Sequence, residues 1–473
     1  MMRLLSVDDC SKLSAEDAQE LYRRFVNPGQ VDLLTSFGFG QTLATRAEGM
    51  VVETQDGRRI LDFTGGIGVL GHGHNHPRIL AARRSYQDQR RMEVHKSFLC
   101  PYVAGLSKNL AAILPEDLEL SFFAASGAEA VEGALKLAYK AHAGRRRHVL
   151  HSDISYHGKL LGTGSITASL EVPFRFQGLE RTAAFRFGDS NSVESLVQSL
   201  RTASGECDIY ALVVEPFSVS TLTACSDEHL RRLRQLADRE GFALIFDEVM
   251  SGWGWTGQTF FFQHSGVVPD VVTMSKTFGG GKSSISAYTA RTPWFRRAYG
   301  DLKDALLHGS TYNAFGEECA TAIEAVRIVM EDDYPGRARR IGARLGDGLR
   351  ILAEKHADLV KEVRGRGCYQ GIVLDTELPG IFESSLVKLE ERVLGDPRMV
   401  KKIVNASVVS RLYDEHGILT YFLQNRDMPL MFCPSMIATD GEVDRFLRAL
   451  DETLGRGRVR LAAEFVANRL RRA

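Results

Sequence analysis

Residues 243–249 read ALIFDEV, and residues 269–281 read PDVVTMSKTFGGG. Each segment contains a short apolar run typical of a buried strand, and a polar side chain follows each run: Asp247 in the first segment and Lys276 in the second. In a parallel sheet the carboxyl ends of the strands share one edge, and ligands bind beyond that edge. We therefore expect Asp247 and Lys276 to lie close together at such an edge.

An Asp and a Lys placed in this way, taken alone, more often form a plain ion pair than a catalytic site. The surrounding residues favour chemistry here. Lys276 is followed by Thr-Phe-Gly-Gly-Gly, a flexible turn that a bulky ring could approach, and Asp247 stands between a buried strand and the Trp253/Trp255 cluster.

Helical and strand-like patterns alternate from about residue 100 onward. The helical run 226–240 has Ser226 as its cap and Gly241 as its terminator. Short apolar runs stand around it at 148–150, 209–214, 243–246 and 270–274. This alternation predicts an α/β fold, in which a mostly parallel sheet is covered by helices on both faces.

The ends of the chain have a different pattern from its middle. Two long helical runs, 337–356 and 441–455, flank a strand-like segment near 369–373, and residues 49–63 alternate around an Asp56-Gly57 turn in the manner of a hairpin. We predict a large domain over residues 71–330 and a smaller α+β domain over residues 331–473. An N-terminal helix and hairpin, residues 1–70, would join the small domain.

Composition narrows the classes of partner. Lys plus Arg and Asp plus Glu each total 59, so no net charge draws the chain to nucleic acid or an anionic membrane. No apolar run reaches the ~18 residues of a membrane span, and the N-terminus does not resemble a signal peptide. The seven cysteines are scattered without a C-x-x-C pair, so we expect no metal and a cytoplasmic location. A small-molecule partner is the default.

A candidate anion site lies at residues 126–128, Ser-Gly-Ala, between an apolar run and a helix that starts near Glu129. Free backbone N–H groups at a helix start bind phosphate, although Ser-Gly before a helix is also a common cap. The second glycine-rich stretch, Gly279-Gly-Gly-Lys-Ser283, is not a nucleotide P-loop, because that motif requires glycine where this chain has Lys276.

A lysine, a carboxylate and a phosphate site together match the needs of pyridoxal 5′-phosphate (PLP). The lysine forms an imine and moves protons, and the carboxylate keeps the pyridine nitrogen protonated so that the ring accepts electrons.

The chain resembles the class III aminotransferases over about residues 40–455. The resemblance is carried by motifs that occur in the family's order and spacing: 121–138, Tyr156-His157-Gly158, Val214-Glu215-Pro216, 244–249, 269–281 and Val363-Arg-Gly-Arg-Gly367. Within this family, the two phenylalanines before Ser126 most resemble the sequences of the putrescine and acetylornithine branch. The resemblance implies a PLP-dependent fold type I homodimer whose active site lies between the subunits, and an aminotransferase that moves an amino group from an amine or amino acid to a keto acid or aldehyde.

The resemblance also implies a role for each matching residue. Lys276 would hold the cofactor as a Schiff base, and Asp247 would partner the pyridine nitrogen. Arg364 would hold a substrate carboxylate. The other expected cofactor contacts are Ser126, Gly127 and Ala128 at the phosphate, Tyr156 and Val249 on the two ring faces, Thr311 from the neighbouring subunit, and His157, Glu215 and Met250 around the ring. We expect His157 to be structural rather than a base.

Three departures from the family pattern affect these expectations. Met250 stands where a glutamine usually donates to the cofactor's phenolic oxygen, and it cannot donate. A methionine there also occurs in glutamate-1-semialdehyde aminomutases, which makes an aminomutase the alternative. Asn313-Ala-Phe315 replaces the usual Gly-Asn-Pro after Thr311. Because Ser220 stands where many members have a gating glutamate, we expect Arg364 to be open to a carboxylate. A non-catalytic PLP-binding protein is a further alternative. The sequence does not name the substrate or the role of the charged stretch 379–410.

Overall fold

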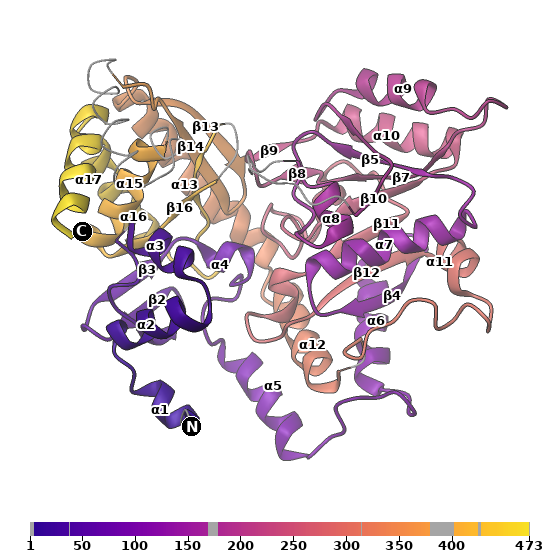
Figure 1. The fold of residues 1–473 in the computed structure, drawn as a ribbon, viewed down its shortest axis with the longest axis horizontal. Helices are drawn as coiled ribbons and strands as arrows, with labels where there is room; N and C mark the ends of the chain where they lie inside the picture. Colours follow the sequence, from indigo (N-terminus) through magenta and orange to yellow (C-terminus); the bar gives the residue numbers. More distant parts are fainter. Residues whose placement is uncertain are drawn as a thin grey trace.

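The computed structural model describes residues 4–36, 38–168, 178–313, 315–378, 402–423 and 427–472. Two lobes are visible in Figure 1, one built on a seven-stranded sheet and the other on the C-terminal helices and a four-stranded sheet. The N-terminal elements lie beside the C-terminal lobe. No helix in the described part of the chain is long and apolar enough to cross a membrane.

The large sheet has the strand order β4-β12-β11-β10-β7-β5-β6. Strand β12 runs antiparallel to β4 and β11, and the other pairings are parallel, as the alternation of helices and strands predicted. The bounds are β4 Leu118–Ala124, β5 His148–Ser152, β6 Thr182–Phe185, β7 Ile209–Val214, β10 Ala243–Asp247, β11 Val271–Met274 and β12 Ser286–Arg291.

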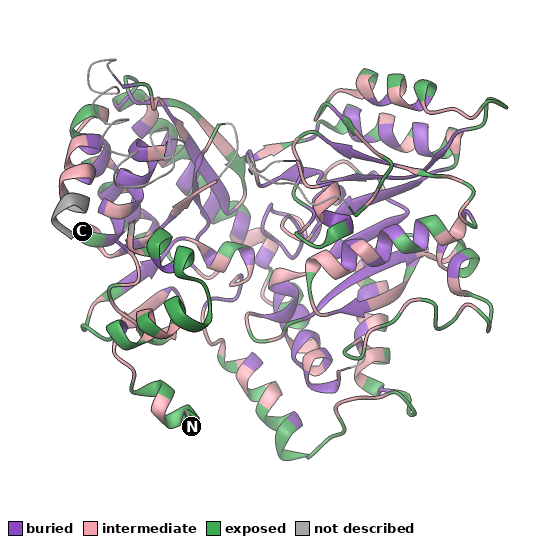
Figure 2. Cartoon of the chain, in the orientation of Figure 1, coloured by how far each residue is buried: buried purple, intermediate pink, exposed green. Residues whose placement is uncertain are grey.

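Helices cover both faces of this sheet. Along β7, Ala211 and Val213 pack in a cluster with residues of α7 and α11, whereas Leu212 and Val214 point into the main core with α10. Figure 2 shows the strands buried between these layers. The helices are α5 Pro77–Asp88, α6 Pro101–Ile113, α7 Gly127–Ala141, α8 Leu161–Ser165, α9 Ser190–Ser199, α10 Asp227–Glu240, α11 Thr292–Tyr299 and α12 Gly316–Glu331, with short 3-10 helices η1 Phe261–His264 and η2 Lys276–Gly279 and a small hairpin, β8 Phe217–Ser218 and β9 Thr223–Ala224.

The C-terminal lobe contains the sheet β13-β14-β17-β16. Its elements are α13 Tyr334–Lys355, β13 Val360–Arg366, β14 Tyr369–Leu374, α15 Ile403–His416, β16 Tyr421–Phe422, β17 Leu430–Phe432, α16 Asp440–Leu454 and α17 Arg458–Arg472. In the charged stretch 379–410, residues 379–401 lie outside the described residues. The remaining part contains the start of α15, at Ile403.

The N-terminal segment pairs with the C-terminal lobe. Strands β2 and β3 form the predicted hairpin, with Gly57 at φ 81° in the turn, and Leu61 of β3 pairs in parallel with Ile418 of β15. The segment comprises α1 Val7–Ser11, α2 Ala15–Phe25, α3 Pro28–Ser36, β1 Ala44–Glu48, β2 Val51–Thr54, β3 Arg59–Asp62 and α4 Gly65–Gly68, and β15 spans Ile418–Leu419. The exact domain boundaries stay a prediction.

Candidate active site

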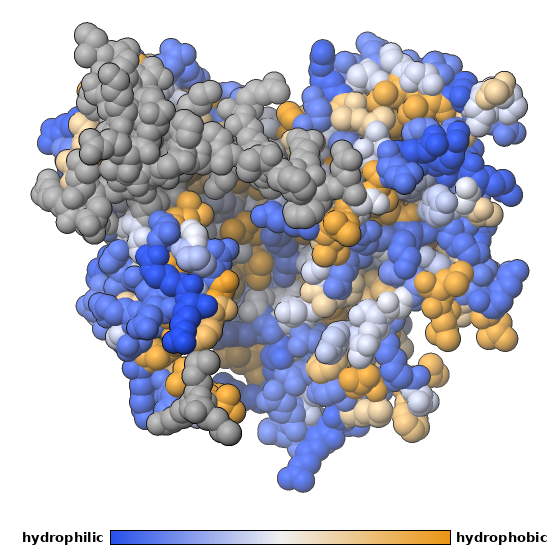
Figure 3. Space-filling view, viewed as in Figure 1, coloured by the Kyte–Doolittle hydropathy of each residue, from blue (hydrophilic) through white to orange (hydrophobic). Residues whose placement is uncertain are grey.

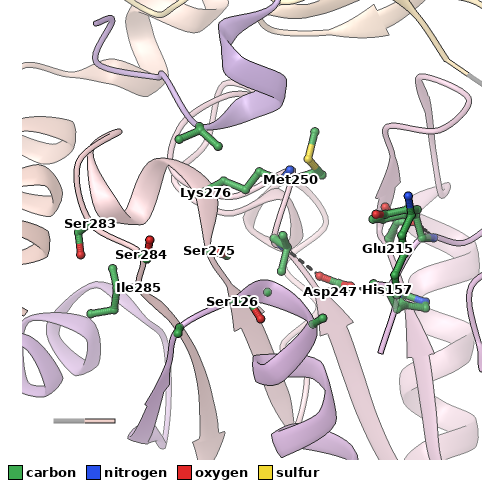
Figure 4. Close-up of a pocket in the computed structure, with 18 residues that line it drawn as sticks. Ser126, His157, Glu215, Asp247, Met250, Ser275, Lys276, Ser283, Ser284 and Ile285 are labelled. Atoms are coloured by element: carbon green, nitrogen blue, oxygen red, sulfur yellow. Dashed lines mark hydrogen bonds and ion pairs between the residues drawn. The ribbon is translucent and has the colours of Figure 1, made fainter. Parts of the chain in front are cut away.

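A cavity of about 420 Å³ opens at the carboxyl edge of the large sheet. Lys276 and Asp247 both line it, one after β11 and the other at the end of β10 (Figure 4). Ten of the twelve predicted site residues line this one cavity: Ser126, Gly127, Ala128, Tyr156, His157, Glu215, Asp247, Val249, Met250 and Lys276. The other two, Thr311 and Arg364, do not.

The Asp247 carboxylate is held at both oxygens. Its Oδ1 accepts hydrogen bonds from the Val249 N–H at 3.1 Å and from the Thr273 hydroxyl at 3.0 Å. Its Oδ2 lies 2.7 Å from Nδ1 of His157. His157 is buried, and its Nε2 has no hydrogen-bond partner among the described residues. This arrangement fixes the carboxylate at the floor of the cavity and makes His157 its orienting partner.

Lys276 begins η2 with a left-handed backbone, φ 57°, which costs a non-glycine residue of order 1–2 kcal/mol. Burial lowers the pKa of its amine below the ordinary value, and Cys433, Asp247 and Glu215 oppose that shift. A lysine with a lowered pKa is neutral more often, which is the form that attacks a carbonyl and accepts a proton.

The start of α7 forms the cradle expected for an anion. The Ser126 side chain caps the Glu129 N–H at 3.3 Å, while the Ser126 carbonyl accepts a hydrogen bond from the Ser286 hydroxyl at 2.6 Å. A Cβ on Gly127 would lie 3.0 Å from Val249, so glycine lets the helix start approach the wall of the cavity. Positions 127 and 128 provide the N–H groups that a helix start leaves without intrahelical partners.

Glu215 and Tyr156 also line the cavity. Oε2 of Glu215 accepts the Tyr156 N–H at 2.9 Å. Burial raises the pKa of Glu215 well above its ordinary value, and the nearby Asp247 carboxylate adds to that shift, against the Tyr156 N–H and Lys276. The Tyr156 side chain is partly exposed at the cavity.

Glu248 is the buried middle residue of the Asp-Glu-Val motif and does not line the cavity. Its carboxylate accepts hydrogen bonds from Ser251 and from the N–H groups of Phe261 and Phe262. Burial raises the pKa of Glu248 to about 7, against these hydrogen bonds. Glu248 therefore ties η1 to the end of β10 and has a structural role.

Two residues near the cavity were missed by the sequence analysis. Tyr369 of β14 donates a hydrogen bond from its hydroxyl to the Met250 carbonyl at 2.8 Å, so the small domain supports the cavity wall. Lys159 is exposed, lines the cavity, and makes no hydrogen bond or ion pair with another residue in the described ranges. Its position directly after Tyr156-His157-Gly158 was the signal that could have identified it.

The expectation that Arg364 is open to a carboxylate is wrong in this structure. Its guanidinium pairs with Glu362 at 2.7 Å and with Asp427 at 2.8 Å, and it donates to the Thr221 carbonyl at 3.3 Å. The missing glutamate at position 220 was the basis for that expectation, but two other acids neutralise the arginine. Thr311 is exposed in a turn before α12.

These residues fit PLP. The cavity holds an amine, a fixed carboxylate and a helix start, which match the aldehyde, the pyridine nitrogen and the phosphate of that cofactor. A Cβ on Gly68 would lie 2.5 Å from the Tyr369 hydroxyl, so the backbone approaches Tyr369 this closely only because residue 68 is glycine. The same Cβ would be in ordinary contact with Cδ of Lys276, at 3.6 Å. Together the fold and the cavity define a PLP-dependent enzyme of fold type I.

The class III aminotransferase family model matches residues 38–454, and the chain belongs to that family. Its cofactor is PLP, and its reaction is transamination; the aminomutase alternative is not favoured. The fold is similar to that of ornithine aminotransferase from Toxoplasma gondii, at 22% identity and a TM-score of 0.78 over 96% of this chain and 98% of that one. Acetylornithine aminotransferase from Elizabethkingia anophelis gives 22% identity and a TM-score of 0.72 over 93% and 99% of the two chains. A transaminase from the marine bacterium Virgibacillus gives 20% identity and a TM-score of 0.74 over 90% of this chain and 94% of that one.

Proposed function

We propose that Lys276 and Asp247 carry the transamination chemistry in this cavity. The observation that supports this most strongly is their position at neighbouring strand ends, on the wall that also contains the start of α7. PLP, when bound, supplies an electron sink for the substrate carbon. Lys276 is the attachment residue and moves the proton at its Nζ. Asp247, held by His157, Val249 and Thr273, keeps a proton on the pyridine nitrogen.

The remaining residues position the cofactor. The N–H groups at Gly127 and Ala128 bind the phosphate, with Ser126 beside them. Val249 and Tyr156 enclose the ring, because both line the cavity and the Tyr156 backbone is fixed by Glu215. This assignment keeps the roles that the family resemblance implied.

The substrates are an amine or amino acid donor and a keto acid or aldehyde acceptor. We assign the binding of a substrate carboxylate to Lys159, because its amine lies at the cavity and has no partner among the described residues. Arg364 remains a candidate for that role only if a substrate displaces Glu362 or Asp427. The names of the ornithine and acetylornithine aminotransferases favour a donor of the ornithine type, an amino acid with a second amine.

The active form is proposed to be a cytoplasmic homodimer. Lys96 links two surface segments by hydrogen bonds to the Ser310 carbonyl and to Asn313. These segments expose a group of large apolar side chains: Phe98 at 68%, Leu99 at 98%, Leu302 at 95%, Leu306 at 94% and Tyr312 at 60%. In Figure 3, hydrophobic residues reach the surface at the lower right, where the segment after α11 runs in Figure 1. A second copy is the proposed cover, since Thr311 belongs to the same segment and would serve the partner's cofactor.

Absorbance measurements test the proposed function. Purified protein loaded with PLP is mixed with α-amino acids, ω-amino acids and diamines, one at a time and without acceptor. A true donor converts the bound cofactor to its pyridoxamine form, and a keto acid restores the first spectrum. If every donor leaves the spectrum unchanged, or if turnover needs no acceptor, transamination is contradicted. Sedimentation of Leu306→Asp, which should shift the protein toward monomer, tests the dimer.

A further inference from the structure

Met250 leaves one atom of the cofactor without a usual partner. The side chain at this position cannot donate a hydrogen bond, and the Met250 backbone carbonyl is an acceptor, which receives the Tyr369 hydroxyl at 2.8 Å. The phenolic oxygen of PLP carries negative charge in the reactive form, and an unpaired charged oxygen in a buried cavity is costly. Another residue of the cavity should therefore supply the donor.

The substitution pattern of the PLP ring shows which wall faces this oxygen. The pyridine nitrogen and the aldehyde carbon lie at opposite ends of the ring, the phosphate arm lies on one side of that axis, and the phenolic oxygen lies on the other. In the proposed function, Asp247 and Lys276 define the axis and Ser126 marks the phosphate side. Figure 4 shows Glu215 on the side of this axis away from Ser126.

The carboxyl group of Glu215 lies at this wall. Its Oε2 accepts the Tyr156 N–H at 2.9 Å, and its Oε1 makes no hydrogen bond with another described residue. The side chain is buried yet lines the cavity. We propose that Glu215 is a protonated carboxylic acid that donates its O–H to the phenolic oxygen of the cofactor, in place of the donor that Met250 lacks. This inference rests on the proposed function.

The groups around Glu215 support a neutral acid. Burial raises the pKa of Glu215 well above its ordinary value, and the Asp247 carboxylate of β10 raises it further, while the Tyr156 N–H and Lys276 of η2 oppose the shift. Cys225, after β9, is a buried thiol whose pKa is raised by its burial, so it adds no charge beside Glu215. A buried carboxylic acid kept neutral in this way is a good hydrogen-bond donor.

Absorbance titration of the bound cofactor tests the proposal without relying on turnover. A donor at the phenolic oxygen stabilises its negative charge, so it lowers the midpoint pH of the spectral transition of the Lys276-linked cofactor. Glu215→Leu removes the donor and should raise that midpoint by about one pH unit. Glu215→Gln keeps one acceptor for the Tyr156 N–H and one donor for the cofactor, so its midpoint should stay close to that of the wild type.

A rescue variant makes the test specific. Adding Met250→Gln to Glu215→Leu supplies the usual donor and should return the midpoint toward the wild-type value. An unchanged midpoint in Glu215→Leu, or equal shifts in the Leu and Gln variants, would overturn the proposal. If Glu215→Leu does not fold, Met250→Gln alone decides: the midpoint should barely move, and a downward shift of about one pH unit would show that the oxygen had no donor. Wild-type protein that shows no cofactor spectrum would contradict the proposed function, not the assignment of Glu215.

Discussion

Nδ1 of His157 lies 2.7 Å from Oδ2 of Asp247, and both side chains are buried. A hydrogen bond to a carboxylate is worth about 1.5–3 kcal/mol. His157→Leu should therefore weaken PLP binding and lower kcat by about tenfold or more. His157→Asn places an amide N–H near the position of Nδ1 and should recover most of the loss. Equilibrium PLP binding and the pH profile of kcat are measured for both variants. Equal defects in the two would show that only the volume of the imidazole ring matters.

Lys159 and Arg364 make opposite predictions about the carboxylate site. Lys159→Ala should weaken the half-reaction with a keto acid such as 2-oxoglutarate by about tenfold, because it removes a cation that lines the cavity and pairs with no acid in the described ranges. Arg364→Ala should have a smaller effect, because Glu362 and Asp427 already neutralise that guanidinium. Single-turnover absorbance changes measure each half-reaction separately. A carboxylate-specific loss in Arg364→Ala, with Lys159→Ala unaffected, would reverse the assignment.

Gly68 and Gly57 form a matched pair, with φ values of 80° and 81°. A Cβ on Gly57 meets nothing within 4 Å, whereas one on Gly68 lies 2.5 Å from the Tyr369 hydroxyl. Gly57→Ala should cost only the ~1–2 kcal/mol of a left-handed alanine. Gly68→Ala should cost more and should also weaken PLP binding, because the added Cβ displaces the Tyr369 hydroxyl, which is hydrogen-bonded to the Met250 carbonyl at the cavity wall. Denaturant unfolding and PLP titration compare them, and equal effects would show that the close approach at Gly68 is not required.

His72 makes stability depend on pH. Its Nε2 lies 3.0 Å from the Ala325 carbonyl, and burial lowers its pKa from 6.5 to about 3. Below pH 6.5 the unfolded chain binds a proton that the folded protein excludes, so stability present above that pH is lost as the pH falls toward 3. Between pH 7 and pH 5 this loss is about 2 kcal/mol. His72→Gln keeps a donor for Ala325 and does not titrate, so its unfolding free energy should fall by about 2 kcal/mol less over that range. An identical fall in wild type and variant would contradict this.

The sequence predicted the large sheet and most of the cavity because these depend on local patterns. Asp247 and Lys276 follow apolar strands directly, and Ser126 precedes a helix with clear periodicity, so strand order alone brings them together. Contacts between distant segments were not predictable in this way. Tyr369 reaches Met250 from the other lobe, and Asp427 neutralises Arg364 from a position 63 residues further along the chain. The missing glutamate at position 220 suggested an open arginine because the pairing with Asp427 leaves no local signal, although Glu362 stands only two residues before Arg364.

Borohydride reduction tests the central claim most directly. Wild-type protein loaded with PLP is reduced, digested and examined by mass spectrometry, beside Lys276→Ala and the neighbouring control Lys282→Ala. We predict one reduced cofactor on Lys276 in the wild type and in Lys282→Ala. Lys276→Ala should carry no adduct and have no turnover, while still binding PLP noncovalently through the cradle at Gly127. A cofactor adduct on a different lysine, or turnover in Lys276→Ala, would contradict the account.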